Sequence, residues 1–216
     1  MADWTAIVRC GSIDVERLTD DQTDDVLDEV FSRDVYRVGA LPLGATVLDL
    51  GANVGSFALR AASERRARVV AYEPDPRSFA CLVANVERNG LAERVRCVEA
   101  AVAGIRGRRT FYIDVGRSVG STLYNRWSEI PTVEVDAVTW LDAIRETGAH
   151  QGLVVKMDIE GAEAEIVADA GFEPALRRID RLMIEWHGRG IEAFRRRLDA
   201  CGFTTEHVGT ILHAVR

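Results

Sequence analysis

The sequence predicts an α/β fold with a mainly parallel sheet, helices on both faces of the sheet and an antiparallel hairpin at the C-terminal end. From Ala45 onwards, short apolar runs alternate with segments of helical composition. Such alternation is typical of parallel strands that are joined by helices. Two further strand-like segments, 203–208 and 210–215, are joined around Gly209 and predict the hairpin. The 216 residues suffice for one domain with a sizeable core.

The first 40 residues are expected to form a separate helical segment that packs on a domain of residues 41–216. Residues 20–31 begin with acidic side chains, and their apolar residues recur at helical spacing: Val26, Leu27, Val30 and Phe31. Pro42 and Gly44 mark the loop that follows this segment.

The predicted strands and helices of the domain follow one another along the chain. Apolar runs predict the strands 46–50, 69–72, 95–98, 153–157 and 181–186. Helical composition or spacing predicts the helices 56–62, 78–88, 140–144, 162–169 and 191–200. The middle of the chain is less regular, with weaker strand patterns at 110–113 and 133–135 and a loop rich in Gly and Ser at 116–122.

The composition is typical of an ordinary globular protein of the cytoplasm. Hydrophobic residues make up 47% and charged residues 28%, and no apolar run approaches the roughly 20 residues of a membrane helix. The first residues lack the pattern of a secretory signal, and four widely spaced cysteines argue against a disulfide framework or a zinc site. The net charge of −7 argues against a nucleic-acid partner, which usually meets a basic face. Lys156 is the only lysine, which we interpret as a compositional bias.

Two glycines and a carboxylate predict a nucleotide-type ligand at the carboxyl ends of the first two strands of the domain. Gly51 and Gly55 follow the strand 46–50, where glycine allows a tight turn and a close approach of the ligand. Glu73 follows the next strand, about 22 residues after Gly51, where a carboxylate can accept hydrogen bonds from a ribose diol. The alternative is that the glycines only make a turn and that Glu73 is a solvated strand end.

The spacing within this loop favours S-adenosylmethionine over a dinucleotide. A dinucleotide fingerprint reads G-x-G-x-x-G, whereas Asn53 stands here where the second glycine would be. Asp49 precedes the loop, and an acidic residue suits the ammonium and sulfonium cations of S-adenosylmethionine better than the phosphates of NAD. A nicotinamide-dependent oxidoreductase remains the alternative.

Four blocks of the sequence resemble, in the same order, the hallmark blocks of FkbM-type methyltransferases. They are DLGANVG at 49–55, YEPDP at 72–76, KMDIEGAE at 156–163 and EWH at 185–187. The resemblance extends over residues 36–208 and implies a Rossmann-like methyltransferase fold with S-adenosylmethionine as the cofactor. Many members of the family methylate hydroxyl groups of polyketides, sugars or other small molecules.

The same resemblance assigns residues to parts of the cofactor. It implies that the loop surrounds the methionine part of S-adenosylmethionine with Asp49, Gly51, Asn53 and Gly55. It also implies that Glu73 binds the ribose and that the segment ending at Ala101 lies near the adenine.

A second acidic cluster supplies candidates for the chemistry. Asp158 ends a central strand, at the edge where open α/β sheets bind ligands, and could orient or deprotonate a hydroxyl acceptor. His187 follows the next strand and is a good general base, unless it is only a strand-end residue bonded to backbone. Glu160 is a further catalytic candidate, and Asp158 and Glu160 could instead hold Mg²⁺. We interpret Glu163 and Glu165 as surface residues that are favoured by the helix dipole.

The sequence says least about the methyl acceptor and the residues that bind it. Ser118, Ser121 and Tyr124 lie in a loop that resembles the family's acceptor loop, which makes them candidates for substrate binding, although a surface loop is an equal alternative. Tyr36 is expected near the mouth of the pocket. The expected activity is methylation of an oxygen of a small molecule; a nitrogen acceptor, a nucleic-acid acceptor and a non-catalytic binding module remain alternatives. A homodimer is compatible with the sequence.

Overall fold

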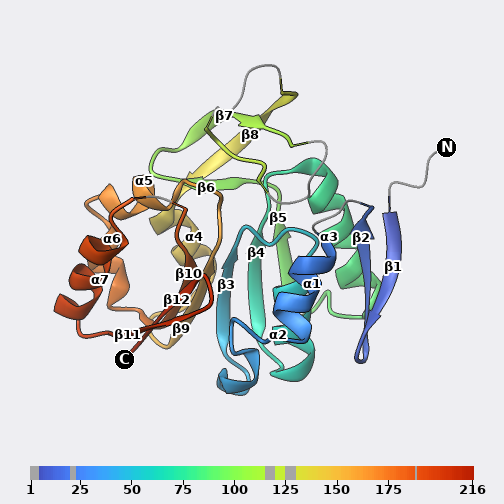
Figure 1. Cartoon of the computed structure of the whole chain (residues 1–216), viewed down its shortest axis with the longest axis horizontal. Coiled ribbons are helices and arrows are strands. Elements are labelled where there is room, and N and C mark those ends of the chain that lie inside the picture. Colours follow the sequence, from blue (N-terminus) through green and yellow to red (C-terminus); the bar gives the residue numbers. More distant parts are fainter. Residues whose placement is uncertain (1–4, 20–22, 115–119, 125–129, 188) are drawn as a thin grey trace.

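The centre of the molecule is a seven-stranded sheet (Figure 1). The computed structural model describes residues 5–19, 23–114, 120–124, 130–187 and 189–216. The strand order is β11-β12-β10-β9-β3-β4-β5. The strands are β3 (Thr46–Leu50), β4 (Arg68–Tyr72), β5 (Val95–Val98), β9 (Leu153–Met157), β10 (Ile179–Glu185), β11 (Thr204–Val208) and β12 (Ile211–Val215).

The predicted fold class is confirmed. The neighbouring strands β5, β4, β3, β9 and β10 pair in parallel. β11 and β12 form the predicted terminal hairpin, and β12 also pairs antiparallel with β10. The chain adds β4 and β5 on one side of β3 and places β9 and β10 on the other. The strand order therefore switches between β3 and β9, which is the point where open α/β sheets bind ligands.

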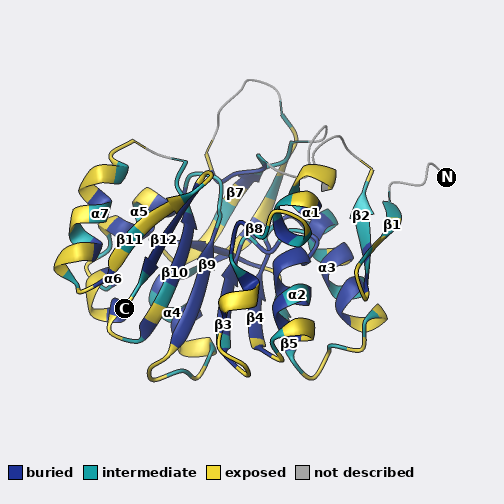
Figure 2. Ribbon diagram, turned by 60° about the horizontal axis from the view of Figure 1, so that its bottom comes forward, coloured by how far each residue is buried: buried dark blue, intermediate teal, exposed yellow. Residues whose placement is uncertain are grey.

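Helices cover both faces of the sheet because its strands are apolar on both faces. Val47 and Val69 pack in one core cluster with Phe57 of the helix Ser56–Glu64, whereas Leu48 packs in another with Trp140 of the helix Trp140–Glu146. Figure 2 shows the buried strands between helices whose outer surfaces are exposed. The helices are α1 (Thr23–Phe31), α2 (Ser56–Glu64), α3 (Pro76–Arg88), α4 (Trp140–Glu146), α5 (Glu163–Ala168), α6 (Phe172–Leu176) and α7 (Ile191–Ala200), with a short 3₁₀ turn at Val38–Ala40. None of the helices in the described part of the chain is long and apolar enough to cross a membrane.

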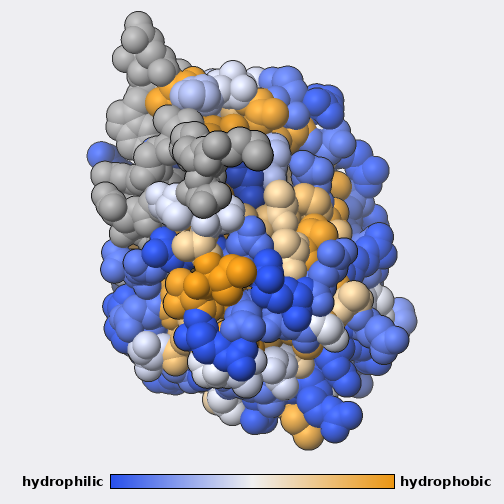
Figure 3. All heavy atoms as spheres, turned by 90° about the vertical axis from the view of Figure 1, so that its right-hand side faces the viewer, coloured by the Kyte–Doolittle hydropathy of each residue, from blue (hydrophilic) through white to orange (hydrophobic). Residues whose placement is uncertain are grey.

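The N-terminal segment contains a hairpin as well as the predicted helix. β1 (Thr5–Cys10) and β2 (Ile13–Leu18) pair antiparallel, so the expectation of a purely helical segment in the first 40 residues is corrected. The hairpin packs on α3, where the amide of Asn85 bonds both Glu16 N and Glu16 O, and the amide of Asn89 bonds both Asp14 N and Asp14 O. Figure 3 views this side of the molecule, where hydrophobic patches lie among hydrophilic residues.

A second, three-stranded sheet lies beyond the carboxyl ends of the central strands (Figure 1, top). It consists of β6 (Ala101–Ala103), β7 (Gly107–Tyr112) and β8 (Thr132–Thr139), in the order β6-β8-β7. The weak strand patterns at 110–113 and 133–135 belong to β7 and β8, whereas β6 and α6 were not predicted. This sheet borders a cavity that is lined by Ala101 of β6 and Phe111 of β7, among other residues.

Candidate active site

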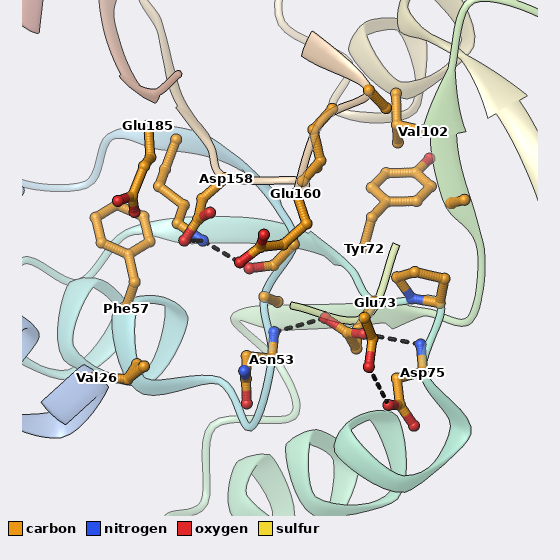
Figure 4. Close-up of a pocket in the computed structure, with 18 of the residues that line it drawn as sticks. Val26, Asn53, Phe57, Tyr72, Glu73, Asp75, Val102, Asp158, Glu160 and Glu185 are labelled. Carbon is orange, nitrogen blue, oxygen red and sulfur yellow. Dashed lines mark hydrogen bonds and ion pairs between the residues drawn. The ribbon is translucent and has the colours of Figure 1, made fainter. Parts of the chain in front are cut away.

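A cavity of about 260 Å³ lies at the carboxyl ends of β3, β4, β9 and β10. Its walls come from the loops that follow these strands, from α1 and from the small sheet. Figure 4 shows Glu185, Asp158 and Glu160 toward one end of the cavity and Glu73 and Asp75 toward the other. The predicted edge of the sheet therefore holds a pocket that is acidic at both ends.

The glycine loop has the conformation that its sequence predicts. Gly51 has a φ of +74°, and a Cβ atom there would collide with the carbonyl oxygen of Asp158. The end of β3 can therefore approach the end of β9 only because residue 51 lacks a side chain. Gly55 has a φ of +93° and faces Leu82 of α3, and it is not among the described residues that line the cavity. Asn53 lines the cavity and is itself left-handed, with a φ of +52°.

Glu73 lies at the floor of the cavity and is held by two backbone groups. Its Oε2 accepts a hydrogen bond from Asn53 N at 2.7 Å, and its Oε1 accepts one from Asp75 N at 2.8 Å (Figure 4). Burial raises the pKa of Glu73 to about 8, against these hydrogen bonds, which lower it. Each oxygen keeps a lone pair that can accept a hydrogen bond from a ribose hydroxyl.

Asp49 and Lys156 form a buried pair beneath the loop. They face each other in the register of β3 and β9, with Lys156 Nζ at 3.5 Å from Asp49 Oδ1. The same ammonium donates to Gly51 O at 2.6 Å and lies 3.6 Å from Asp158 Oδ2. Burial would lower the pKa of Lys156, but the surrounding carboxylates more than reverse this, so its pKa is raised. Asp49 is fully buried and is not among the described residues that line the cavity, whereas Lys156, which the sequence analysis set aside, is.

Three predicted catalytic residues meet at the end of the cavity that faces β9 and β10. His187 Nε2 lies 4.0 Å from Asp158 Oδ1 and 3.6 Å from Glu160 Oε2. Burial lowers the pKa of His187, but the hydrogen bond from its Nδ1 to Glu163 and the charges of the nearby carboxylates raise it to about 9. Tyr36 donates a long hydrogen bond of 3.4 Å to Asp158 Oδ2 and lines the cavity.

The candidates for acceptor binding in the loop differ in whether they line the cavity. Ser121 lines the cavity, accepts a hydrogen bond from Asp114 N and lies 3.4 Å from Asp75 Oδ2. Tyr124 instead donates to Glu165 Oε2 at 2.6 Å and is not among the described residues that line the cavity. Ser118 lies outside the described residues. Ala101, predicted near the adenine, lines the cavity beside Ala100 and Val102.

Sequence reasoning did not assign roles to Glu163 and Glu185, which lie at this site. Glu163 is almost fully buried instead of exposed, and Glu185 lines the cavity. Within the described part of the chain, Asp158, Glu185 and His187 each offer a ligand atom, and these atoms lie within 4.8 Å of one another. Glu160, which was paired with Asp158 in the predicted Mg²⁺ site, is not part of this group. The Glu185-Trp186-His187 block was the available signal, because alternate residues of a strand end point to the same side.

The fold and the site together define a Rossmann-like, S-adenosylmethionine-dependent methyltransferase. A model of the methyltransferase FkbM domain matches residues 49–205. The chain belongs to the FkbM methyltransferase family. This decides between the two enzyme classes that the glycine loop left open, in favour of methyl transfer.

Two curated relatives are methyltransferases. The 31-O-demethyl-FK506 methyltransferase FkbM of Streptomyces tacrolimicus is 31% identical over 74% of this chain and 72% of its own length. The methyltransferase sdnD of Sordaria araneosa is 24% identical over 66% of each chain.

Solved structures share the fold at low identity. TYW2 of Pyrococcus horikoshii, solved in complex with MeSAdo, has a TM-score of 0.50 at 14% identity and covers 99% of this chain and 70% of its own. Sp1610 of Streptococcus pneumoniae, in complex with S-adenosyl-L-methionine, has a TM-score of 0.51 at 18% identity and covers 85% of this chain and 71% of its own.

Proposed function

We propose that the protein transfers the methyl group of S-adenosylmethionine to a hydroxyl oxygen of a small molecule. The observation that carries this proposal is the meeting of Asp158 and His187, two groups that can accept a proton, at the end of the cavity away from Glu73. The name of the Streptomyces tacrolimicus relative, which specifies methylation at an oxygen, supports the same reaction.

The donor fits the opposite part of the cavity. Glu73 would accept hydrogen bonds from the ribose diol, and Ala101 and Val102 would face the adenine. The methionine part would lie along the loop at Gly51 and Asn53. Asp49 would act from beneath this loop through Lys156, because it does not reach the cavity itself.

The reaction needs a base as well as alignment. The acceptor oxygen attacks the methyl carbon, the bond from that carbon to sulfur breaks, and the hydroxyl proton leaves to a nearby base. His187 Nε2 and Asp158 are placed for this proton. The cationic sulfonium and ammonium of bound S-adenosylmethionine would favour the neutral form of His187, which is the form that can accept a proton.

A divalent metal ion is a second way to activate the hydroxyl. Asp158, Glu185 and His187 have the spacing that one ion requires, and Mg²⁺ bound there would lower the pKa of a coordinated hydroxyl. We therefore propose a screen of small molecules with labelled S-adenosylmethionine, run with and without EDTA. Labelling of hydroxyl compounds is expected; labelling of amines alone would contradict the oxygen acceptor, and loss of activity in EDTA would show that a metal takes part.

Asp158→Asn tests the catalytic assignment directly. The amide keeps the shape of the side chain but cannot accept a proton, so kcat should fall by roughly 10²- to 10⁴-fold. Asp180→Asn is the matched control, because Asp180 is an exposed carboxylate on β10 and is not among the described residues that line the cavity. An unchanged kcat in Asp158→Asn would refute the assignment.

A further inference from the structure

We propose that Glu163 is a positioning residue, whose buried carboxylate holds the ring of His187 so that Nε2 faces the acceptor. Glu163 Oε1 lies 2.9 Å from His187 Nδ1. This proposal deepens the function proposed above and rests on it, because His187 needs an acceptor hydroxyl with which to exchange a proton.

The Glu163 carboxylate is itself held in place. It is 1% exposed, and its Oε1 accepts hydrogen bonds at 3.3 Å from Ile159 N and from Gly161 N. These backbone groups belong to the turn between β9 and α5, the same turn that carries Asp158. The carboxylate therefore has a fixed position relative to the residues that line the cavity.

The contact decides which ring nitrogen carries the proton in neutral His187. Glu163 Oε1 already accepts hydrogen bonds from two backbone N–H groups, so it also acts as the acceptor toward His187. Nδ1 is then the donor, and Nε2 keeps the lone pair of the neutral ring. The distances from Nε2 to Asp158 Oδ1 (4.0 Å) and to Glu160 Oε2 (3.6 Å) are too long for hydrogen bonds. The contacts to these two carboxylates therefore leave the Nε2 lone pair for an acceptor hydroxyl.

This arrangement follows the logic of catalytic triads, in which a carboxylate fixes the tautomer and orientation of a histidine base. It also separates Glu163 from Glu165, which lies two residues later on α5. Glu165 bonds Tyr124 and Arg109 and is half-exposed. Glu165 is therefore a matched control: the same residue type on the same helix, without contact to the histidine.

Nuclear magnetic resonance tests the contact without any acceptor. In the ¹⁵N-labelled protein, we expect a far-downfield Nδ1–H proton resonance, which a hydrogen bond to a carboxylate produces and which His187→Gln removes. Glu163→Gln should abolish this resonance and Glu165→Gln should keep it. Persistence of the resonance in Glu163→Gln would overturn the proposal. If Glu163→Gln folds poorly, the wild-type protein still decides, because a wild-type spectrum without the His187 resonance would overturn the proposal equally.

Kinetics then test the consequence. With an acceptor in hand, Glu163→Gln should lower kcat by roughly 10- to 100-fold, as loss of an orienting partner does, with KM for S-adenosylmethionine unchanged. In the His187→Gln background, Glu163→Gln should have no further effect, because the residue that it orients is gone. An equal further loss there would overturn the proposal. Failure to find any hydroxyl acceptor would count against the proposed function alone, since the resonance experiment does not depend on it.

Discussion

Glu73 illustrates how burial sets the chemistry of one side chain. Its pKa of about 8 keeps the carboxyl group mostly protonated at neutral pH, because burial disfavours the charge. A ribose diol donates hydrogen bonds, and an ionised carboxylate accepts them more strongly than a neutral acid. Cofactor binding should therefore favour the ionised form.

We expect the affinity for S-adenosylhomocysteine to rise between pH 7 and pH 9 in the wild-type protein, as Glu73 ionises. Glu73→Gln should weaken binding at pH 9 by about 1.5–3 kcal/mol, or roughly 10- to 150-fold, and less at pH 7, where the neutral acid resembles the amide. Isothermal titration calorimetry at both pH values measures this. An affinity in Glu73→Gln with the same pH dependence as in the wild type would contradict the assignment.

Gly51 is required for the close approach of two strand ends. Gly51→Ala adds a Cβ atom that meets the Asp158 carbonyl and forces alanine into a left-handed conformation. Together these should lower the free energy of unfolding by about 2–5 kcal/mol. Gly90→Ala is the control, because Gly90 has a similar φ of +66° and no atom within 4 Å of the added Cβ, so it should lose only about 1–2 kcal/mol. Chemical denaturation compares the two; equal losses would show that crowding at Gly51 is unimportant.

At the scale of elements, α3 connects the N-terminal hairpin to the glycine loop at residues 51–55. Asn85 is fully buried, and its amide bonds Glu16 on β2 and also donates to Val54 O in the loop at 2.8 Å. Asn89, one turn later, bonds Asp14 on β2. The hairpin and the loop therefore share one anchor, Asn85.

Asn85→Ala should destabilise the protein by about 2–4 kcal/mol, because it leaves buried backbone groups unsatisfied, and should also weaken cofactor binding. Asn89→Ala should destabilise it less and leave the affinity for S-adenosylhomocysteine unchanged, since none of the Asn89 contacts described above involves the loop. Thermal denaturation and calorimetry on both variants test this. Equal affinities in both variants would mean that α3 does not support the loop.

At the scale of the whole molecule, the cavity joins parts that are far apart in the sequence. Its walls include α1, the loops of the central sheet and the small sheet β6-β8-β7. A ligand that bridges these parts binds only the folded chain and must stabilise it as a unit.

Saturation with S-adenosylhomocysteine at about 100 times its Kd should add roughly 2.7 kcal/mol of stability, or about 5–11 °C in Tm for a domain of this size. NADH at the same concentration should give no shift. Differential scanning calorimetry measures both. A shift with NADH and none with S-adenosylhomocysteine would contradict the cofactor assignment.

Patterns that are local in the chain predicted most of the fold. The alternation of apolar runs and helices predicted the parallel sheet, and the glycines with Glu73 predicted the edge at which the cavity lies. The β1–β2 hairpin was missed although Gly11-Ser12 separates two alternating segments, which is a hairpin signal.

The sequence by itself determined the fold class, the family and the edge of the sheet where the cavity lies, because strand periodicity and short motifs are written in consecutive residues. Only the tertiary structure decided the partners. Asp49 meets Lys156 through the register of β3 and β9, and Glu163 meets His187 across the turn after β9. These pairings depend on which strands are neighbours and how they are aligned. Glu163 and Lys156, which the sequence did not mark as functional, are therefore buried at the site.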